Sequence, residues 1–383
     1  MLVITNAKIV LSDRILYGHD LVTDKGKITG ILQKGSFDHS GCEFSDAKGY
    51  YLGPGLVDIH NHGGAGVWFG DDPDRAALFH LSHGTTCIMA TTTIQKTHQM
   101  ILYAIKNITG AVKTGRGAAS KVIRGIHMEG PYLSPKYGAF KNYTRIPVKE
   151  EYMAYVKAAE GLIKIWTVAP ELPDIIEMLK DLRPDPDDPL PVISAGHSDA
   201  TTDQVDALIP YGLRLQTHSC CATGCSISPS RYAGTREVDF DMACWLKDEI
   251  SVEVIPDSKG IHTRPKMLQL ILKIKGPDRV IIVTDATEAS GRAGQISDVN
   301  ITGEGLTGSA LTLNKACSNM MAHTGISIID AFRMASYNPA KLIGMDKEIG
   351  SVEEGKRADL ILVDDDMDIH GIWLNGETVQ PVV

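Results

Sequence analysis

Between residues 54 and 349, apolar strand-like segments alternate with helical stretches, and this alternation constrains the fold more than any other feature. The segments carry Val, Ile and Thr almost continuously, which is typical of parallel strands covered by helices on both faces. Seven or eight such units predict a (β/α)8 barrel of the TIM type, with a flat doubly wound sheet as the alternative. The segments after the first strand are TTCIMATTTI, KVIRGIHMEG, IKIWTVAPE, PVISAGHSDA, LRLQTHSC, EISVEVIPD and RVIIVTDAT.

The two ends of the chain have a different pattern. Residues 1–53 and 350–383 consist of short β-rich runs separated by Gly, Asp and Asn turns, as in an antiparallel sheet. Each end is too short to form a hydrophobic core alone. We therefore expect both ends to pair into one small β-domain, with the barrel of residues 54–349 inserted between them.

Composition excludes several classes of protein. The chain of 383 residues has no apolar run long enough to span a bilayer, and its first residues do not have the pattern of a signal peptide. A net charge of -9 disfavours nucleic acid and anionic membranes as partners. Seven Cys residues, an odd number without an export signal, disfavour a disulfide framework and predict a reducing cytoplasm.

Polar residues of the metal-binding type collect where the predicted strands end. In barrel enzymes the chemistry is placed at this edge. A single His there is more often a hydrogen-bonded structural residue, but six residues at one edge favour a cation, and His with carboxylate suits zinc, iron or manganese. Asp58, on the same strand face as the first two His residues, is expected to orient an imidazole. The six residues are His60, His62, Glu129, His197, His218 and Asp285.

Two glycine-rich stretches, GGAGVWFGDD and GEGLTGS, carry no nucleotide-binding signature. Neither has the strand–GxGxxG–helix context of a dinucleotide site or the GK[ST] of a P-loop. We expect both to be loops.

Eight motifs lie along nearly the whole chain: GPGLVDIHNHGG, HMEGPYLSP, AGHSDAT, TH at 217–218, VTDA, EGLTGSALTL, NPAKLIG and GSVEEGKRADLILVD. In this order they resemble the signatures of N-acetylglucosamine-6-phosphate deacetylases in the amidohydrolase superfamily. The resemblance implies a distorted (β/α)8 barrel with a β-sandwich built from both termini. It also implies a metal-dependent hydrolase that removes the acetyl group from an N-acetylated amino sugar, giving amino sugar and acetate. The implied substrate is N-acetylglucosamine 6-phosphate or a closely related epimeric or unphosphorylated sugar.

The same resemblance assigns roles to the strand-end residues. Glu129, His197 and His218 are the implied ligands of one divalent ion, zinc first, with iron or manganese as alternatives. His60 and His62 are the implied ligands of a second ion, with Glu129 between the two. Asp285 matches the aspartate that acts as general base and then as general acid.

The substrate side departs from the family pattern. Ala139 and Phe140 stand near the place where members carry a His that contacts the scissile carbonyl, and Cys221 and Ala222 replace an Asn-Ala pair that helps to hold the phosphate. These departures predict a shifted preference, towards an epimeric or unphosphorylated sugar. Two further residues match family positions: Arg231, which would approach a neighbouring subunit's site in a homodimer, and His262, which would contact the sugar.

Two other functions stay open at this point. One is a different amidohydrolase reaction, on a cyclic amide or an N-acyl amino acid, or a deamination. Against it, enzymes of that kind commonly bridge their metals with a Lys, and this chain offers Glu129 instead. The other is a non-catalytic scaffold of the same fold, which would be expected to have lost metal ligands.

Overall fold

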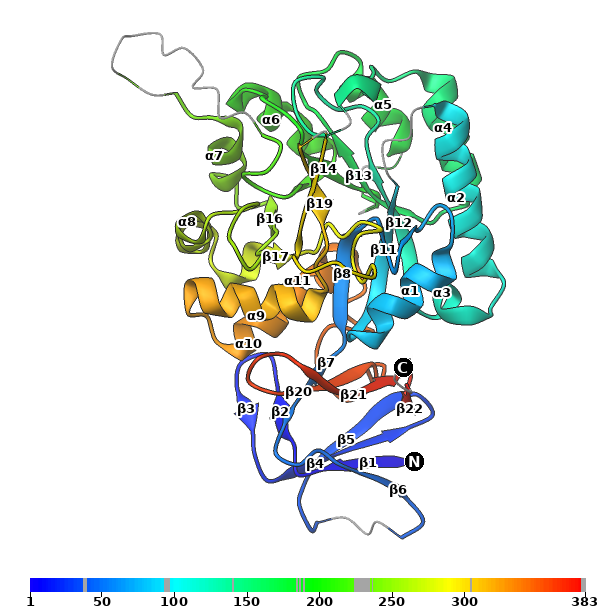
Figure 1. The fold of residues 1–383 in the computed structure, drawn as a ribbon, viewed down its shortest axis with the longest axis vertical. Helices are drawn as coiled ribbons and strands as arrows, with labels where there is room; N and C mark the ends of the chain where they lie inside the picture. Colours follow the sequence, from blue (N-terminus) through cyan, green and yellow to red (C-terminus); the bar gives the residue numbers. More distant parts are fainter. Residues whose placement is uncertain are drawn as a thin grey trace.

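A parallel barrel stands on a smaller β-structure in the computed structural model (Figure 1). Eight parallel strands form the barrel sheet, which is nearly closed by a single bridge between Asn61 and Ala286. The predicted barrel with β-structure from both chain ends is confirmed, and the flat doubly wound alternative is wrong. In order round the barrel the strands are β8 (Leu56–Asn61), β11 (Thr85–Thr92), β12 (Ile123–Glu129), β13 (Ile163–Val168), β14 (Val192–Ala195), β15 (Leu213–Gln216), β16 (Ser251–Val254) and β17 (Val280–Ile282). The structure describes residues 1–36, 40–92, 97–139, 141–183, 185, 187–188, 190–223, 235, 237–303 and 305–379.

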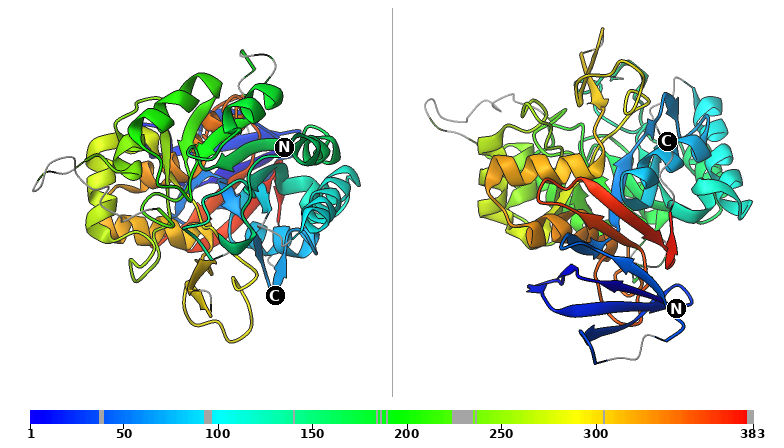
Figure 2. Two further views of the ribbon diagram at one scale, coloured as in Figure 1. Left: turned by 90° about the horizontal axis from the view of Figure 1, so that it is seen from above. Right: turned by 60° about the horizontal axis from the view of Figure 1, so that its bottom comes forward.

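Helices cover the outside of the barrel and bury apolar stripes against it (Figures 1 and 2). In α2, the buried residues Ile101, Ala104, Ile105 and Ile108 follow the spacing of one helix face. A capping box in which the Thr201 hydroxyl accepts from the Gln204 amide starts α6. No helix in the described ranges is long and apolar enough to cross a lipid bilayer. The helices are α1 (Pro73–Ser82), α2 (His98–Lys113), α3 (Gly117–Val122), α4 (Lys149–Ala159), α5 (Ile175–Leu182), α6 (Thr202–Leu208), α7 (Phe240–Trp245), α8 (Pro265–Lys275), α9 (Leu313–Thr324), α10 (Ile328–Phe332) and α11 (Asn338–Leu342), with a π-helical turn at Arg333–Tyr337.

Both chain ends contribute to two small sheets that pack on each other. A separate apolar core, including Leu2, Ile4, Leu52, Leu360 and Trp373, fills the space between them. One sheet has the order β5 (Lys27–Gln33), β4 (His19–Asp24), β1 (Leu2–Thr5), β6 (Glu43–Asp46). The other has the order β22 (Glu377–Thr378), β21 (Ile369–Leu374), β20 (Leu360–Val363), β7 (Tyr51–Pro54), β2 (Lys8–Val10), β3 (Ile15–Leu16).

The sheets of this sandwich are mixed rather than antiparallel, which corrects the expectation from the turn pattern. Strand β1 pairs with β6 in parallel, and β2 pairs with β7 in parallel. The chain leaves β5 at one edge of its sheet and returns to the far side of β1, and a crossover of this kind produces a parallel pair. Turn residues predict hairpins between consecutive strands but carry no signal for such a return.

Each of the two glycine-rich stretches contributes to a short hairpin, so the expectation of plain loops is wrong. Strands β9 (Gly63–Gly64) and β10 (Val67–Trp68) pair with each other, as do β18 (Val299–Thr302) and β19 (Gly305–Ser309). The second hairpin rises from the barrel on the side away from the sandwich (Figure 2, right). Glycine is required at position 63, because a Cβ there would lie 2.3 Å from the carbonyl oxygen of Val67.

Candidate metal centre

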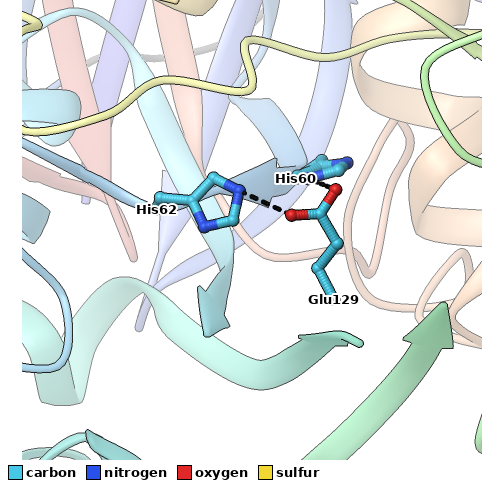
Figure 3. Close-up of side chains that lie close together, drawn as sticks. All are labelled: His60, His62 and Glu129. Carbon is cyan, nitrogen blue, oxygen red and sulfur yellow. Dashed lines mark ion pairs between the residues drawn. The ribbon is translucent and has the colours of Figure 1, made fainter. Parts of the chain in front are cut away.

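The carboxylate of Glu129, the last residue of β12, lies at the centre of the site. His62 places its Nε2 atom 3.2 Å from Glu129 Oε2, and His60 places its Nε2 atom 3.4 Å from Glu129 Oε1 (Figure 3). From the other side of the barrel, the Nε2 atoms of His197 and His218 lie 3.0 Å and 3.1 Å from Glu129 Oε1. One carboxylate therefore faces four imidazoles that come from three different strands.

The hydrogen bonds fix which imidazole nitrogens are free to bind a cation. His218 donates from Nδ1 to the carbonyl oxygen of Cys221 at 3.0 Å, so its Nε2 atom carries the lone pair. That atom lies 3.1 Å from Nε2 of His197. His60 Nε2 is buried and has no hydrogen-bond partner among the described residues. Lone pairs that converge on a carboxylate in a buried site fit a divalent cation between them.

The residues that project into the site are held in unusual backbone conformations. His197, His218 and Asp285 have φ angles of 48°, 24° and 48°, which are uncommon for residues other than glycine. The surrounding chain maintains these conformations: the amide of Asp285 donates to the carbonyl of His60 at 2.9 Å, and the carbonyl of Asp285 accepts from the amide of Ser309 at 2.7 Å. Backbone strain of this kind collects at functional sites, where it aims the side chains.

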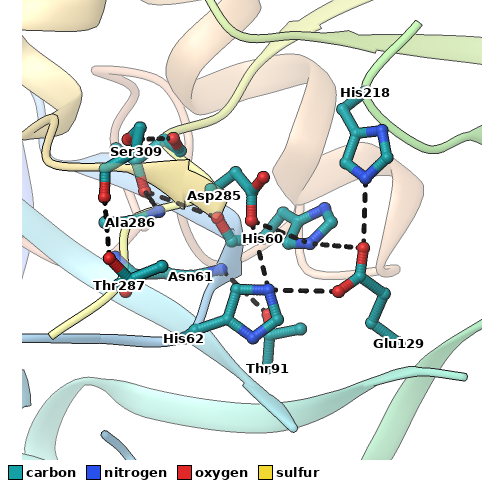
Figure 4. A network of polar contacts seen from close by, with 12 residues as sticks. His60, Asn61, His62, Thr91, Glu129, His218, Asp285, Ala286, Thr287 and Ser309 are labelled. Atoms are coloured by element: carbon teal, nitrogen blue, oxygen red, sulfur yellow. Dashed lines mark hydrogen bonds and ion pairs between the residues drawn. The ribbon is translucent and has the colours of Figure 1, made fainter. Parts of the chain in front are cut away.

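Asp285 faces two of the four histidines that Glu129 faces (Figure 4). Its Oδ1 atom lies 3.1 Å from Nε2 of His62 and 3.5 Å from Nε2 of His60. Burial alone would raise the pKa of Asp285, but the charge of His60 and the hydrogen bond from His62 hold that pKa below its usual value. Asp285 is therefore an ionised carboxylate at neutral pH, as a proton acceptor must be.

Asp58 is placed differently from the expectation. Its carboxylate accepts from the Thr284 hydroxyl at 2.6 Å and from the Asn61 side-chain amide at 2.9 Å, and no imidazole ring of the described residues bonds to it. Desolvation raises the pKa of Asp58 to about 6. Asp58 therefore ties β8 to the end of β17, where the barrel closes.

Glu253 is a buried acidic residue of the site that the sequence reasoning did not identify. Its Oε2 atom lies 2.9 Å from Nδ1 of His60 and accepts from the backbone amide of His218 at 3.1 Å. A signal was present: Glu253 interrupts an apolar strand at an inward-facing position, between Val252 and Val254. Glu253 does not share the strand-end position that indicates the other residues of the site.

A cavity beside the centre contains part of the predicted substrate set. Ala139, Cys221 and Ala222 line this cavity. His262 lies behind its wall, where Nδ1 is 3.0 Å from Asp257 Oδ2 and Nε2 donates to the carbonyl of Gly308 at 3.0 Å. Phe140 and Arg231 lie outside the described residues. The complete lining is His62, Trp68, Glu129, Gly138, Ala139, His197, His218, Cys221, Ala222, Asp285, Thr287, Leu306, Thr307 and Gly308.

Comparisons with known proteins place these features in a wider context. Residues 51–379 match the sequence profile of the Amidohydrolase family. The N-acetylglucosamine-6-phosphate deacetylase of Bacillus subtilis (strain 168) is 29% identical over 392 residues, covering 96% of this chain and 94% of that protein. The N-acetylgalactosamine-6-phosphate deacetylase of Escherichia coli O157:H7 is 28% identical over 346 residues, covering 85% and 87%. The crystal structure of N-acetylglucosamine-6-phosphate deacetylase from Pasteurella multocida superposes with a TM-score of 0.84 at 28% identity, covering 99% of both chains.

Proposed function

This chain belongs to the amidohydrolase family, and from that premise we propose that it removes the acetyl group from an N-acetylated hexosamine or its 6-phosphate. The observation that carries the proposal is the set of Glu129, His197 and His218 within 3.1 Å of one another, with Asp285 across the site. Likeness over most of the chain to deacetylases of two hexosamine phosphates supports the substrate class.

Two groups of residues would hold divalent cations. Glu129, His197 and His218 offer one site, and His60, His62 and Glu129 offer a second. The donor set of imidazoles and a carboxylate suits zinc, which we propose as the cation, with iron or manganese as alternatives. When bound, the cation supplies Lewis acidity that makes hydroxide available at neutral pH and polarises an amide carbonyl.

Asp285 would carry the proton between the two halves of the reaction. Its ionised carboxylate, 3.1 Å from His62, is positioned to accept a proton from the attacking water. The same carboxyl group would then donate this proton to the departing nitrogen, because an amine leaves as a neutral group only when it is protonated. The backbone anchors on both sides of Asp285 keep the carboxylate aimed at the cavity through this exchange.

The wall of the cavity supports a proposal about the sugar. Cys221 lines the wall and has only a weak donor where a phosphate-binding amide would be expected from the family resemblance. Ala139 offers no side-chain donor to a carbonyl. We therefore propose that the preferred substrate is not N-acetylglucosamine 6-phosphate but an epimeric or unphosphorylated N-acetyl hexosamine.

A screen tests both parts of the proposal. Acetate release is measured for N-acetylglucosamine, N-acetylgalactosamine and N-acetylmannosamine, each with and without a 6-phosphate, using protein of known metal content. We expect acetate release from at least one of these sugars. The kcat/KM of the best sugar should exceed that of N-acetylglucosamine 6-phosphate by at least about tenfold. This contrast equals about 1.4 kcal/mol, which one weakened hydrogen bond can account for.

Two outcomes would contradict the proposal at different levels. If N-acetylglucosamine 6-phosphate has the highest kcat/KM, Ala139 and Cys221 do not affect specificity. The proposed deacetylase activity is then still supported. Hydrolysis of a cyclic amide or an N-acetyl amino acid, with no acetate from any of the sugars, would assign the site to another amidohydrolase reaction.

We also propose that the active assembly is a homodimer, with Arg231 close to the neighbouring subunit's site. The family resemblance supports this arrangement. Light scattering gives the oligomeric state, and mixing an Arg231→Ala chain with an Asp285→Asn chain tests the shared site. Activity restored in the mixture, beyond that of either variant alone, is the result expected of a site built from both subunits.

A further inference from the structure

Glu253 is a carboxylate inside the barrel, on strand β16 next to the last strand β17, with no exposed surface. A charge removed this completely from water needs strong partners. Oε2 has two partners, Nδ1 of His60 at 2.9 Å and the backbone N–H of His218 at 3.1 Å. Oε1 has none among the described residues.

These contacts determine the direction of the hydrogen bonds. The amide of His218 can only donate, so Oε2 of Glu253 accepts there. Oε1 has no hydrogen-bond partner among the described residues, so both contacts of the carboxylate are made by Oε2. Nε2 of His60 faces Glu129 and Asp285, and when a cation is bound there the one proton of the ring lies on Nδ1, which then donates to Oε2 of Glu253.

A different interpretation is a separate cation bound by His60, His127 and Glu253, whose ligand atoms also lie close together. The hydrogen bonds of His127 argue against it. Its Nδ1 atom donates to the carbonyl of Ile59 at 2.8 Å, and its Nε2 atom accepts from the Thr167 hydroxyl at 2.7 Å. His127 has no lone pair left for a cation, so Glu253 supports the centre already described.

The two contacts of Oε2 connect opposite parts of that centre. His60 belongs to β8 and to the second cation group, whereas His218 follows β15 and belongs to the first. His218, whose backbone amide donates to Glu253, has a φ angle of 24°. This strained conformation needs support from contacts outside the residue. A single oxygen atom therefore restrains an imidazole of one group and the main chain of the other.

We propose that Glu253 is a positioning residue that fixes the Nδ1–H tautomer of His60 and couples the two cation groups through the main chain of His218. The proposal rests on the metal centre of the proposed function. It predicts that cation affinity falls at both groups when the carboxylate is removed, and falls more at the group that contains His60.

Cation affinity measured without substrate tests this proposal. Metal-free wild type, Glu253→Ala and Glu253→Gln are titrated with Zn²⁺ against a chromophoric chelator. We expect Glu253→Ala to weaken binding by about 10–100-fold, the usual effect of removing a partner of a ligating His. Glu253→Gln should weaken binding less, because its amide oxygen can still accept from His60 and His218.

A matched control separates this effect from general destabilisation. Asp359 is also a buried carboxylate, paired with Arg357 in the sandwich at 2.9 Å. Asp359→Asn neutralises a buried carboxylate at constant size, as Glu253→Gln does, and it should lower the unfolding midpoint without changing Zn²⁺ affinity. Wild-type Zn²⁺ affinity in folded Glu253→Ala would overturn the proposal.

A measurement on the wild type does not depend on whether the Glu253 variants fold. In Zn²⁺-loaded protein with ¹⁵N-labelled histidine, the His60 signal is identified by its loss in His60→Gln. A proton on Nδ1 of His60 supports the proposal, and an unprotonated Nδ1 overturns it. Neither experiment uses acetate release, so a wild type that binds Zn²⁺ as described but deacetylates no sugar would refute the proposed function alone.

Discussion

Asp285 shows how single residues acquire a chemical role from their surroundings. Its carboxylate faces His60 and His62, and its backbone is fixed by hydrogen bonds to His60 and Ser309. The left-handed conformation at this residue would relax if either backbone contact were lost. An aspartate at the same depth without these neighbours would be protonated by desolvation and would be unable to accept a proton.

Replacing Asp285 by Asn tests this role. The amide keeps the size of the side chain and cannot take up a proton, so kcat should fall by about 10²–10⁴-fold. Metal content and the circular dichroism spectrum should match those of the wild type. Turnover close to that of the wild type in a folded, metal-loaded Asp285→Asn protein would assign the proton transfer to another group.

Among single residues, the sequence predicts those of the metal centre that stand at strand ends. It does not predict those whose role depends on tertiary contacts. His60, Glu129 and Asp285 stand at strand ends, where the barrel architecture alone places chemistry. Glu253 is recognisable only when the inward face of β16 is known, because a lone acid in an apolar strand does not reveal its partners. The placement of Asp58 on Thr284 and Asn61 depends on how the barrel closes, which strand patterns do not encode.

Among the elements, β8 brings the most chemistry into the barrel. All six of its residues are buried, and alternation sends Val57 and Ile59 outwards while Asp58 and His60 point inwards. His62 follows two residues after His60, beyond the end of the strand. One strand therefore supplies both imidazoles of the second cation group.

Removing both imidazoles tests the two-cation arrangement. In a His60→Ala plus His62→Ala protein, bound metal should fall to half the wild-type number of ions per chain. The ion held by Glu129, His197 and His218 should remain, since none of its ligands is changed. Metal analysis by plasma mass spectrometry gives the count, and an unchanged count would make His60 and His62 structural residues.

Among the elements, the sequence predicts those with a long regular pattern and misses those that depend on tertiary contacts. Continuous apolar strands separated by helices predict the eight-stranded barrel, because both faces of such strands must be covered. The β9–β10 and β18–β19 hairpins are short and glycine-rich, with too few alternating residues to be recognised. The parallel pairs β1–β6 and β2–β7 depend on where the chain crosses its own sheet.

On the scale of the whole molecule, β20 joins the two hydrophobic cores. Leu360 and Leu362 pack into the core of the sandwich, and Ile361 and Val363 pack into the core of the barrel. Close packing continues at Gly53, where a Cβ would lie 2.3 Å from the ring of Phe332. The division at residues 53/54 and 349/350 stays a proposal about domain boundaries, and the packing of β20 argues that the two parts unfold together.

The stability of the whole molecule should fall in mild acid through His80. This buried side chain donates from Nε2 to the carbonyl of Gly63 at 2.8 Å, and its Nδ1 atom has no partner among the described residues. Burial, assisted by the charge of His83, lowers the pKa of His80 to about 4 despite the bond to Gly63. The unfolded chain takes up this proton below about pH 6.5, and the native state does so only near pH 4, so stability present above pH 6.5 is lost progressively between these values.

Urea unfolding of metal-free wild type and His80→Gln measures this contribution. Between about pH 7.5 and about pH 5, the wild type should lose about 2 kcal/mol more than the variant, from the shift of the His80 pKa. The other histidines titrate in both proteins and cancel in the comparison. Equal losses would mean that His80 is protonated as readily in the native state as in the unfolded chain.

The pairing of β7 with β20 also has a consequence during synthesis on the ribosome. Pro54 lies opposite Leu360, so roughly 300 residues separate two strands that are neighbours in one sheet. At roughly 5–20 residues per second, β7 emerges about 15–60 s before its partner exists. Throughout that interval an apolar strand edge is open to other nascent chains, a well-known template for aggregation. We therefore expect a chaperone that binds the β7 segment to reduce aggregation of nascent chains.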